Sequence, residues 1–280
     1  MKTPQTAVSP QQRAFAFLKL LAEDLSKGQI TFPTFADATM KIRTALNDPE
    51  IDAGKLSRLV SSEPLLSAKL LRVANSAALN SSGKPVSDVK SAVMRVGHET
   101  VKTLAVTVAM EQLQGGSHLG PARPHTEAVW RHSLMVAAIA FVIAQKMSKL
   151  SPDEALFAGL VHDIGKFYLL SRAAKHPELF DDPVELQALL SDWHASIGVA
   201  VLESMTIPQT ILKAVNEHEV GAYHVPPRSL ADVVVLANSA ANALESVASG
   251  QTAEPIEPTV GQLLQENESE IRSLLAALRN

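Results

Sequence analysis

Apolar residues recur at intervals of three and four positions in nearly every segment of this sequence. After Pro10, for example, Phe15, Leu18, Leu21 and Leu25 fall on one face of a helix. Such spacing is typical of amphipathic helices, because about 3.6 residues complete one turn. Aromatic residues make up only 4% of the sequence, which favours helices packed on helices over a β-sandwich core. Apart from an ambiguous run at 232–236, no β pattern is present, so the sequence predicts an all-α fold.

Clusters of proline and glycine divide these helical segments. Residues 115–124 contain three glycines and two prolines, which cannot continue a helix and therefore indicate a boundary between subdomains. The expected organisation is an N-terminal helix within 1–30, a helical subdomain at 31–114, a linker at 115–125, a second helical subdomain at 126–248, and a proline-rich linker with one C-terminal amphipathic helix at 249–280. Within the subdomains, helices are expected at 35–46, 53–61, 86–96, 99–113, 126–147, 152–170, 184–205, 208–216 and 230–247.

The composition excludes several classes of function. The 25 basic and 29 acidic residues leave a net charge of −4, so no broad positive surface is expected to hold nucleic acid or anionic lipid. Cysteine is absent, which excludes a disulfide scaffold, a thiolate zinc site and a cysteine nucleophile. The longest strongly apolar run, at 134–144, is shorter than the roughly 20 residues that span a membrane, and it predicts a buried helix. We expect a cytoplasmic protein without a membrane partner, in which a metal is bound by His, Asp, Glu and water.

One short string carries the most specific chemical signal: His162-Asp163-Ile164-Gly165-Lys166 after an apolar run. On the helix expected here, His162 and Asp163 would present an imidazole nitrogen and a carboxylate to nearly one point, and the carboxylate can bridge two ions. Lys166 lies four residues after His162 and is therefore expected on the same helical face, where its charge can hold a phosphate oxygen beside a metal. Alternatively, Lys166 only forms a salt bridge with Asp163.

Three further histidines are spaced as a metal centre in a helical bundle requires. His132, His194 and His218 each lie on or at the end of a different expected helix. Helices that aim His and Asp inward build sites for divalent ions such as Mn, Mg or Fe. Taken alone, His132 is equally well explained as a buried histidine bonded to backbone, and His194 and His218 as surface groups. The sequence therefore predicts a site that can hold a divalent metal, and a site without metal is the alternative.

The sequence resembles the HDOD family, the HD-related output domain of bacterial signalling proteins, over about 32–242. The first half contains the string from Glu63-Pro64 to Asn75-Ser76 that looks like the family hallmark, although the family usually has Asp-Pro at its start. The resemblance implies an HD-domain-like helical bundle with an N-terminal helical subdomain, related to HD metal-dependent phosphohydrolases. It also implies a set of metal ligands, namely His132, His162, Asp163, His194 and His218.

Two departures from the family pattern concern the metal ligands. HD enzymes close the site with an Asp on a late helix, where this sequence has Asn238, and an amide is a neutral and weaker ligand. Asp232 lies six residues earlier, which is not a whole number of turns, so we do not expect it to substitute. The cyclic-dinucleotide phosphodiesterase branch has a His-His-Glu string. Here the string is Glu217-His218-Glu219, in which Glu217 remains a candidate ligand.

These observations favour a regulatory signalling module with a partly degenerate HD metal site, which binds a partner protein or a small phosphorylated or nucleotide ligand. The alternative is a metal-dependent phosphohydrolase acting on a nucleotide or another phosphate ester. In that case the five ligands hold one or two ions, an activated water attacks phosphorus, and Asp163 and Lys166 are the catalytic residues. Nucleic-acid binding is disfavoured by the net charge, and the oligomeric state is not predicted.

Overall fold

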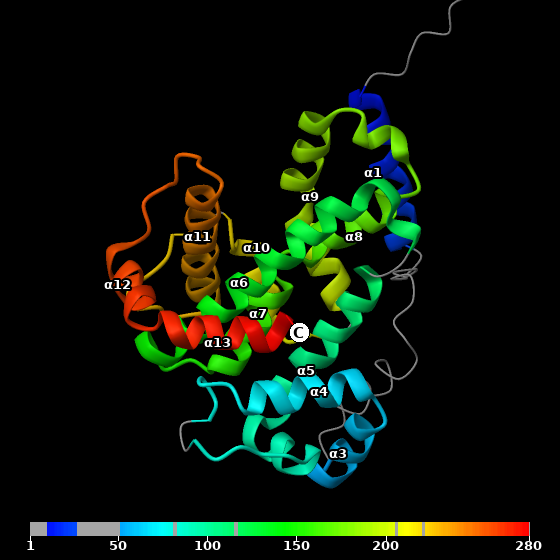
Figure 1. The fold of residues 1–280 in the computed structure, drawn as a ribbon. Coiled ribbons are helices and arrows are strands. Elements are labelled where there is room, and N and C mark those ends of the chain that lie inside the picture. The colour runs from blue at the N-terminus through cyan, green and yellow to red at the C-terminus, as the bar shows by residue number, and fades with distance from the viewer. Residues whose placement is uncertain are drawn as a thin grey trace, which may run out of the picture.

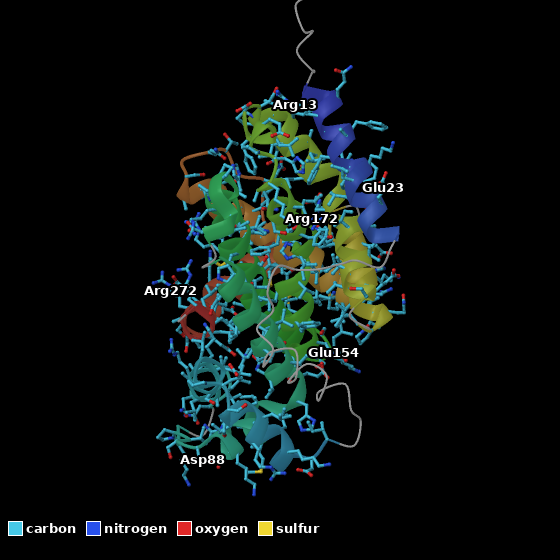
Figure 2. All side chains as sticks on the ribbon, turned by 90° about the vertical axis from the view of Figure 1, so that its right-hand side faces the viewer. Arg13, Glu23, Asp88, Glu154, Arg172 and Arg272 are labelled. Atoms are coloured by element: carbon cyan, nitrogen blue, oxygen red, sulfur yellow. The ribbon has the colours of Figure 1, made fainter. Side chains whose placement is uncertain are left out.

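The computed structural model describes residues 10–26, 51–80, 83–114, 117–204, 207–219 and 222–279 (Figure 1). These ranges form α-helices and two short 3-10 helices, and they contain no strand. The all-α prediction is confirmed. The helix expected at 35–46 lies outside the described residues. Charged side chains of both signs cover the exterior, as the exposed Asp88, Glu154 and Arg272 illustrate (Figure 2).

The first half of the molecule is built from α3 (Ala53–Ser61), α4 (Pro64–Ala74) and α5 (Val89–Gln114). Asp52 caps α3 by accepting a hydrogen bond of 2.7 Å from the Lys55 amide. Asn75 ends α4, and its side chain makes two hydrogen bonds of 2.8 Å with the backbone of Val86. Within α5, Gly97 has φ 78°, which breaks the helix where two separate helices were expected.

A buried helix, α6 (Arg123–Met147), forms the centre of the second half. It begins three residues before the expected position, because Pro124 is tolerated in the first turn of a helix. Helices α6 and α11 (Leu230–Ala248) lie in segments long and apolar enough to cross a membrane, but 72% and 61% of their apolar windows are buried inside the fold. The residues of 134–144 pack on neighbouring helices, as predicted for a buried core helix.

Helices α7 (Pro152–Val161), α8 (Ile164–Ala173) and α11 pack against α6. Helix α9 (Pro183–Glu203) packs on α8, and α10 (Gln209–Glu217) lies between α9 and α11. The first helix, α1 (Pro10–Ser26), packs against α9. The single helix expected at 152–170 is therefore wrong, since α7 ends and α8 begins on either side of His162 and Asp163. This break positions the candidate ligands described below.

The C-terminal segment forms two helices, α12 (Pro258–Glu266) and α13 (Glu268–Arg279), where one was expected. The break is at Asn267, whose side-chain amide donates to the carbonyl of Leu263. Helix α13 lies across α6 and reaches α4 of the first half (Figure 1). There the buried Lys69 ammonium donates to the Leu278 carbonyl at 2.9 Å and pairs with Glu111 at 2.8 Å. The C-terminal helix thus ties the two halves together.

Candidate metal centre

The junction between α7 and α8 places His162 and Asp163 in the interior. Asp163 leaves the helical conformation, with φ −101° and ψ 16°, so its carboxylate does not follow either helix axis. Gly165 makes this geometry possible, because a Cβ there would lie 1.8 Å from the His194 carbonyl oxygen and 2.7 Å from the Gly198 amide nitrogen. Only glycine lets α8 approach α9 this closely. The close approach brings Asp163 beside His194.

Three histidines present the same ring nitrogen to a common point. Each donates its Nδ1–H to a carbonyl of its own helical turn: His162 to Gly159 at 2.8 Å, His194 to Leu190 at 2.8 Å and His218 to Val215 at 2.7 Å. Because a carbonyl only accepts hydrogen bonds, this fixes the proton on Nδ1. The lone pair of each Nε2 therefore faces the centre, which is the tautomer that metal-ligating histidines require.

The ligand atoms at this point lie close together, and two of them have no hydrogen-bond partner in the described structure. The Nε2 atoms of His194 and His218 face each other at 3.1 Å, and Asp163 Oδ1 lies 3.6 and 3.5 Å from them. His162 Nε2 and Asp163 Oδ1 are buried without a hydrogen-bond partner in the described structure. Facing lone pairs repel, and an unpaired buried carboxylate oxygen is costly. A cation among these atoms removes both penalties, so the residues fit a metal ion.

Glu219 and Lys166 line the more exposed side of the same centre. Glu219 Oε1 lies 3.4 Å from His194 Nε2 and 3.8 Å from His218 Nε2. The Lys166 ammonium lies 3.0 Å from Asp163 Oδ2 and 3.4 Å from Glu219. Asp163, His194, His218 and Glu219 place one ligand atom each within 4.8 Å of one another. We call these four residues with His162 the open end of the centre.

The ionisation of the open end suits a cation. Burial lowers the pKa of His162 to about 4, although the Asp163 carboxylate opposes the shift. Burial raises the pKa of Asp163, but the neighbouring His162, with contributions from His218 and Lys166, holds the pKa of this carboxyl well below its usual value. The neighbouring His194 lowers the pKa of Glu219 to about 2, against the effect of burial. At neutral pH the centre thus holds a neutral His162 ring and two carboxylates.

The opposite end of the centre is formed by His132, which lies 5.2 Å from the His162 ring between centroids. With His162 and Asp163 it makes a second group of ligand atoms within 4.8 Å of one another. Its Nε2 is 2.9 Å from Asn238 Oδ1, and its Nδ1 is 3.2 Å from Glu245 Oε2. Both neighbours are hydrogen-bond acceptors, and Asn238 Oδ1 also accepts from Asn242 at 3.3 Å. We call His132, Asn238 and Glu245 the closed end.

The surroundings of His132 favour a charged ring. Burial on its own lowers the pKa of His132, but the hydrogen bond and charge of Glu245, with the charge of Asp163, raise this pKa above its usual value. A ring that donates from both nitrogens offers no lone pair to a metal. The closed end therefore favours a protonated ring over a metal ligand, while the lone pairs of the open end favour a cation.

Comparison with known families decides the classification. The HDOD domain family matches residues 32–220, which is more than half of the chain. The chain belongs to the HDOD family. The resemblance seen in the sequence is therefore confirmed.

Solved structures share this HDOD fold along almost the whole chain. A candidate metal-dependent phosphohydrolase from Shewanella amazonensis has a TM-score of 0.75 at 25% identity, covering 95% of this chain and 99% of that one. An HDOD domain protein of unknown function from Geobacter sulfurreducens has a TM-score of 0.60 at 20% identity, with 96% and 98% covered. A candidate signal transduction protein from Marinobacter aquaeolei has a TM-score of 0.60 at 18% identity, with 97% and 66% covered. The latter two demonstrate a common fold.

Among curated proteins, an uncharacterized protein of Treponema pallidum is 25% identical over 225 residues. The match covers 74% of the HDOD chain and 41% of the relative, so the chain spans less than half of that protein's length.

The structure brings together most, though not all, of the residues that the sequence suggested. His132, His162, Asp163, Lys166, His194, His218 and Asn238 all lie at the centre. Glu217 does not, since its carboxylate lies 4.0 Å from Lys213 near the surface. Asp232 caps α11 together with Ser229, as expected for a residue outside the site.

Sequence reasoning missed two acidic residues of this HDOD centre. Glu219 was quoted in the string Glu217-His218-Glu219, but which of the two glutamates turns inward depends on how the chain leaves α10. Glu245 lies seven residues after Asn238, which is two helical turns, and this spacing places both on one face. That spacing was the signal available for Glu245.

Proposed function

We propose that this HDOD chain is a signalling output module whose open end binds one divalent cation. The observation that carries the proposal is the convergence of the Nε2 and carboxylate atoms of His162, Asp163, His194 and His218, of which His162 Nε2 and Asp163 Oδ1 have no hydrogen-bond partner in the described structure. Two ionised carboxylates beside facing imidazoles favour a divalent ion over a shared proton. The closed end, with a neutral amide and a protonated ring, argues against a second ion.

The types of ligand also indicate which metal ion suits the site. Three imidazoles with two carboxylates suit Mn²⁺ or Fe²⁺, whereas Mg²⁺ prefers oxygen ligands and water. When bound, such an ion supplies a Lewis acid for a phosphate or carboxylate oxygen. Lys166 is held beside it by Asp163 and Glu219 and adds a positive charge. The module would read out this state to a regulatory protein partner or a small phosphorylated ligand.

A second candidate function is hydrolysis of a phosphate ester. It is favoured by the position of Lys166, which is partly exposed and lies 3.0 Å from the buried Asp163. A phosphate that enters from the Glu219 side would meet this ammonium, which stabilises negative charge developing on the phosphoryl oxygens. The similarity to a candidate metal-dependent phosphohydrolase from Shewanella amazonensis supports the same function.

Metal analysis combined with activity assays separates the two functions. The purified protein would be titrated with Mn²⁺ and anaerobic Fe²⁺ by calorimetry and assayed on nucleotides and aryl phosphates. His162→Ala tests the centre, and His176→Ala is the matched control, since His176 lies at the surface paired with Glu178. Metal binding without turnover supports the signalling module. Turnover that depends on metal, His162 and Lys166 makes the chain an enzyme, and failure to bind either ion contradicts both functions.

A further inference from the structure

A groove runs beneath the C-terminal helices, where α12 and α13 lie against α6 and α11. It consists of two neighbouring cavities that share Met135 of α6 in their walls. We call them the apolar cavity, of about 510 Å³, and the polar cavity, of about 580 Å³. Each volume lies within the range of roughly 300–1,000 Å³ that small-molecule sites occupy.

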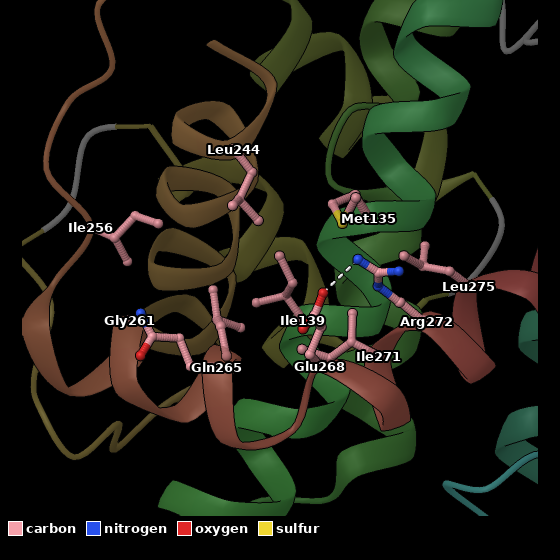
Figure 3. A pocket seen from close by; sticks show the side chains of 11 residues that line it. Met135, Ile139, Leu244, Ile256, Gly261, Gln265, Glu268, Ile271, Arg272 and Leu275 are labelled. Carbon is pink, nitrogen blue, oxygen red and sulfur yellow. Dashed lines mark ion pairs between the residues drawn. The ribbon is translucent and has the colours of Figure 1, made fainter. Parts of the chain in front are cut away.

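Aliphatic side chains from α6, α11 and the C-terminal helices point into the apolar cavity (Figure 3). The main wall residues are Met135, Ile139, Leu244, Leu264, Ile271 and Leu275. Glu268 and Arg272, which form an ion pair at 2.5 Å, also line it. No aromatic side chain of the described residues lines it. It therefore suits a hydrocarbon chain better than a nucleobase, which is typically held by stacking on aromatic rings.

The polar cavity carries positive charge. Arg131 of α6 and Arg279 of α13 both line it and both are exposed. Within the part of the chain that the structure describes, neither guanidinium forms an ion pair. The one acidic wall residue, Glu245, is already paired with His132 at 3.2 Å. Two free arginines on facing helices form a site for a carboxylate or a phosphate, which guanidinium groups bind with paired hydrogen bonds.

We propose that this groove binds a single-chain amphipathic anion, with the hydrocarbon tail in the apolar cavity and the anionic head between Arg131 and Arg279. The inference depends on the two cavities being neighbours. The hydrocarbon tail needs an apolar cavity, and the anionic head needs positively charged side chains next to it. The ligand is a free molecule rather than a bilayer lipid, because α12 and α13 cover a cavity that lies between helices. The groove shares Glu245 with the closed end but is lined by none of the open-end residues, so the proposal holds whether or not the centre binds metal.

The groove also lies beside two contacts described above. Arg279 follows Leu278, whose carbonyl accepts the hydrogen bond from the buried Lys69 of the first half. Glu245 lines the polar cavity and holds His132 of the closed end. A ligand in the groove thus contacts elements that join the two halves and elements that position the centre.

Calorimetry on the metal-free full-length chain tests the site, with dodecanoate and dodecyl phosphate as probes below their micellar concentrations. We expect one of these anions, or both, to bind at one molecule per chain, and the two arms tell a carboxylate head from a phosphate head. Acetate and inorganic phosphate should not bind measurably, and dodecyl maltoside, which has an uncharged head, should bind at least tenfold more weakly. Absence of saturable binding by both anions, or equal binding of the maltoside, overturns the proposal.

Two variants locate the ligand. Leu244→Trp fills the apolar cavity and should weaken binding at least tenfold, whereas Val247→Trp changes an exposed residue of the same helix outside both cavities and should not. Arg131→Ala combined with Arg279→Ala should weaken binding similarly, and these exposed positions keep the test valid if the tryptophan variant does not fold. Unchanged affinity in the arginine variant, or in a folded Leu244→Trp protein, overturns the proposal, as does binding to anionic vesicles without binding to the free anions.

Discussion

Asp163 lies within ligand distance of both ends of the histidine centre, yet the two ends differ in how well they suit a cation. At the open end, His194 and His218 direct two Nε2 lone pairs at each other across 3.1 Å. At the closed end, the Nε2 of His132 meets the amide oxygen of Asn238 at 2.9 Å. The facing lone pairs of the open end favour an added cation, whereas the two acceptors around His132 favour a protonated ring at the closed end.

This difference depends on what holds Nδ1. At the open end a backbone carbonyl accepts from Nδ1, so each Nε2 presents its lone pair to the centre. At the closed end the carboxylate of Glu245 raises the pKa of His132 and stabilises the imidazolium. Histidines that look equivalent in the sequence therefore differ in charge, and a set of five family ligands does not by itself imply two metal ions.

The largest effect is expected from Asp163→Ala, because Asp163 contributes to both groups of possible ligand atoms. Loss of a direct ligand should exceed the roughly 10- to 100-fold loss of metal affinity that follows removal of an outer partner. Titration with Mn²⁺ measures it, with His176→Ala as the control. Metal affinity within a few-fold of the original protein would show that the cation, if bound, does not lie at Asp163.

Gly165→Ala should disrupt the open end alone. The added Cβ would meet the backbone of His194 at 1.8 Å, so α8 must move away from α9. We expect a loss of about 3 kcal/mol in the free energy of unfolding, measured by urea denaturation. Gly198→Ala is the matched control, since its nearest neighbour is a Val215 methyl at 3.2 Å. Equal losses in both variants would contradict the importance of the α8–α9 approach.

The helical fold and most of the centre follow from the sequence, because both depend on local patterns. Apolar periodicity predicts the helices, and the His162-Asp163 string with three spaced histidines predicts the ligands. The break between α7 and α8 was not predicted, since apolar residues continue through it and its cause is the contact of Gly165 with a distant helix. Which glutamate beside His218 turns inward is likewise set by tertiary packing.

The two ends should also respond to pH with opposite signs. The folded-state pKa of His162 is about 4, below its usual 6.5, so its contribution to stability is present above pH 6.5 and is lost as the pH falls toward 4. The raised pKa of His132 gives a contribution that is present below pH 6.5 and is lost as the pH rises through the folded-state pKa.

Denaturation of the chelator-treated protein between pH 7 and pH 5 separates these contributions. His162→Gln should lose stability less steeply with acid than the original protein, by on the order of 2 kcal/mol over this interval. The His132→Gln variant should lose stability with acid more steeply than the original protein. Parallel pH profiles for the two variants would show that the ends do not differ in ionisation.

The smallest effect is expected from Asn238→Asp, which tests whether the closed end can be made to bind a metal ion. A carboxylate in place of the amide adds a negative charge beside His132 and Asp163, and ligand charge is a main determinant of divalent affinity. We expect roughly tenfold tighter Mn²⁺ binding and a second ion per chain. Asn242→Asp, one turn further along α11 and exposed, is the control. A carboxylate also stabilises the imidazolium, so proton and metal compete for His132 Nε2, and the gain should grow between pH 6 and pH 8. An unchanged stoichiometry at the higher pH would show that Glu245, rather than Asn238, keeps this end closed.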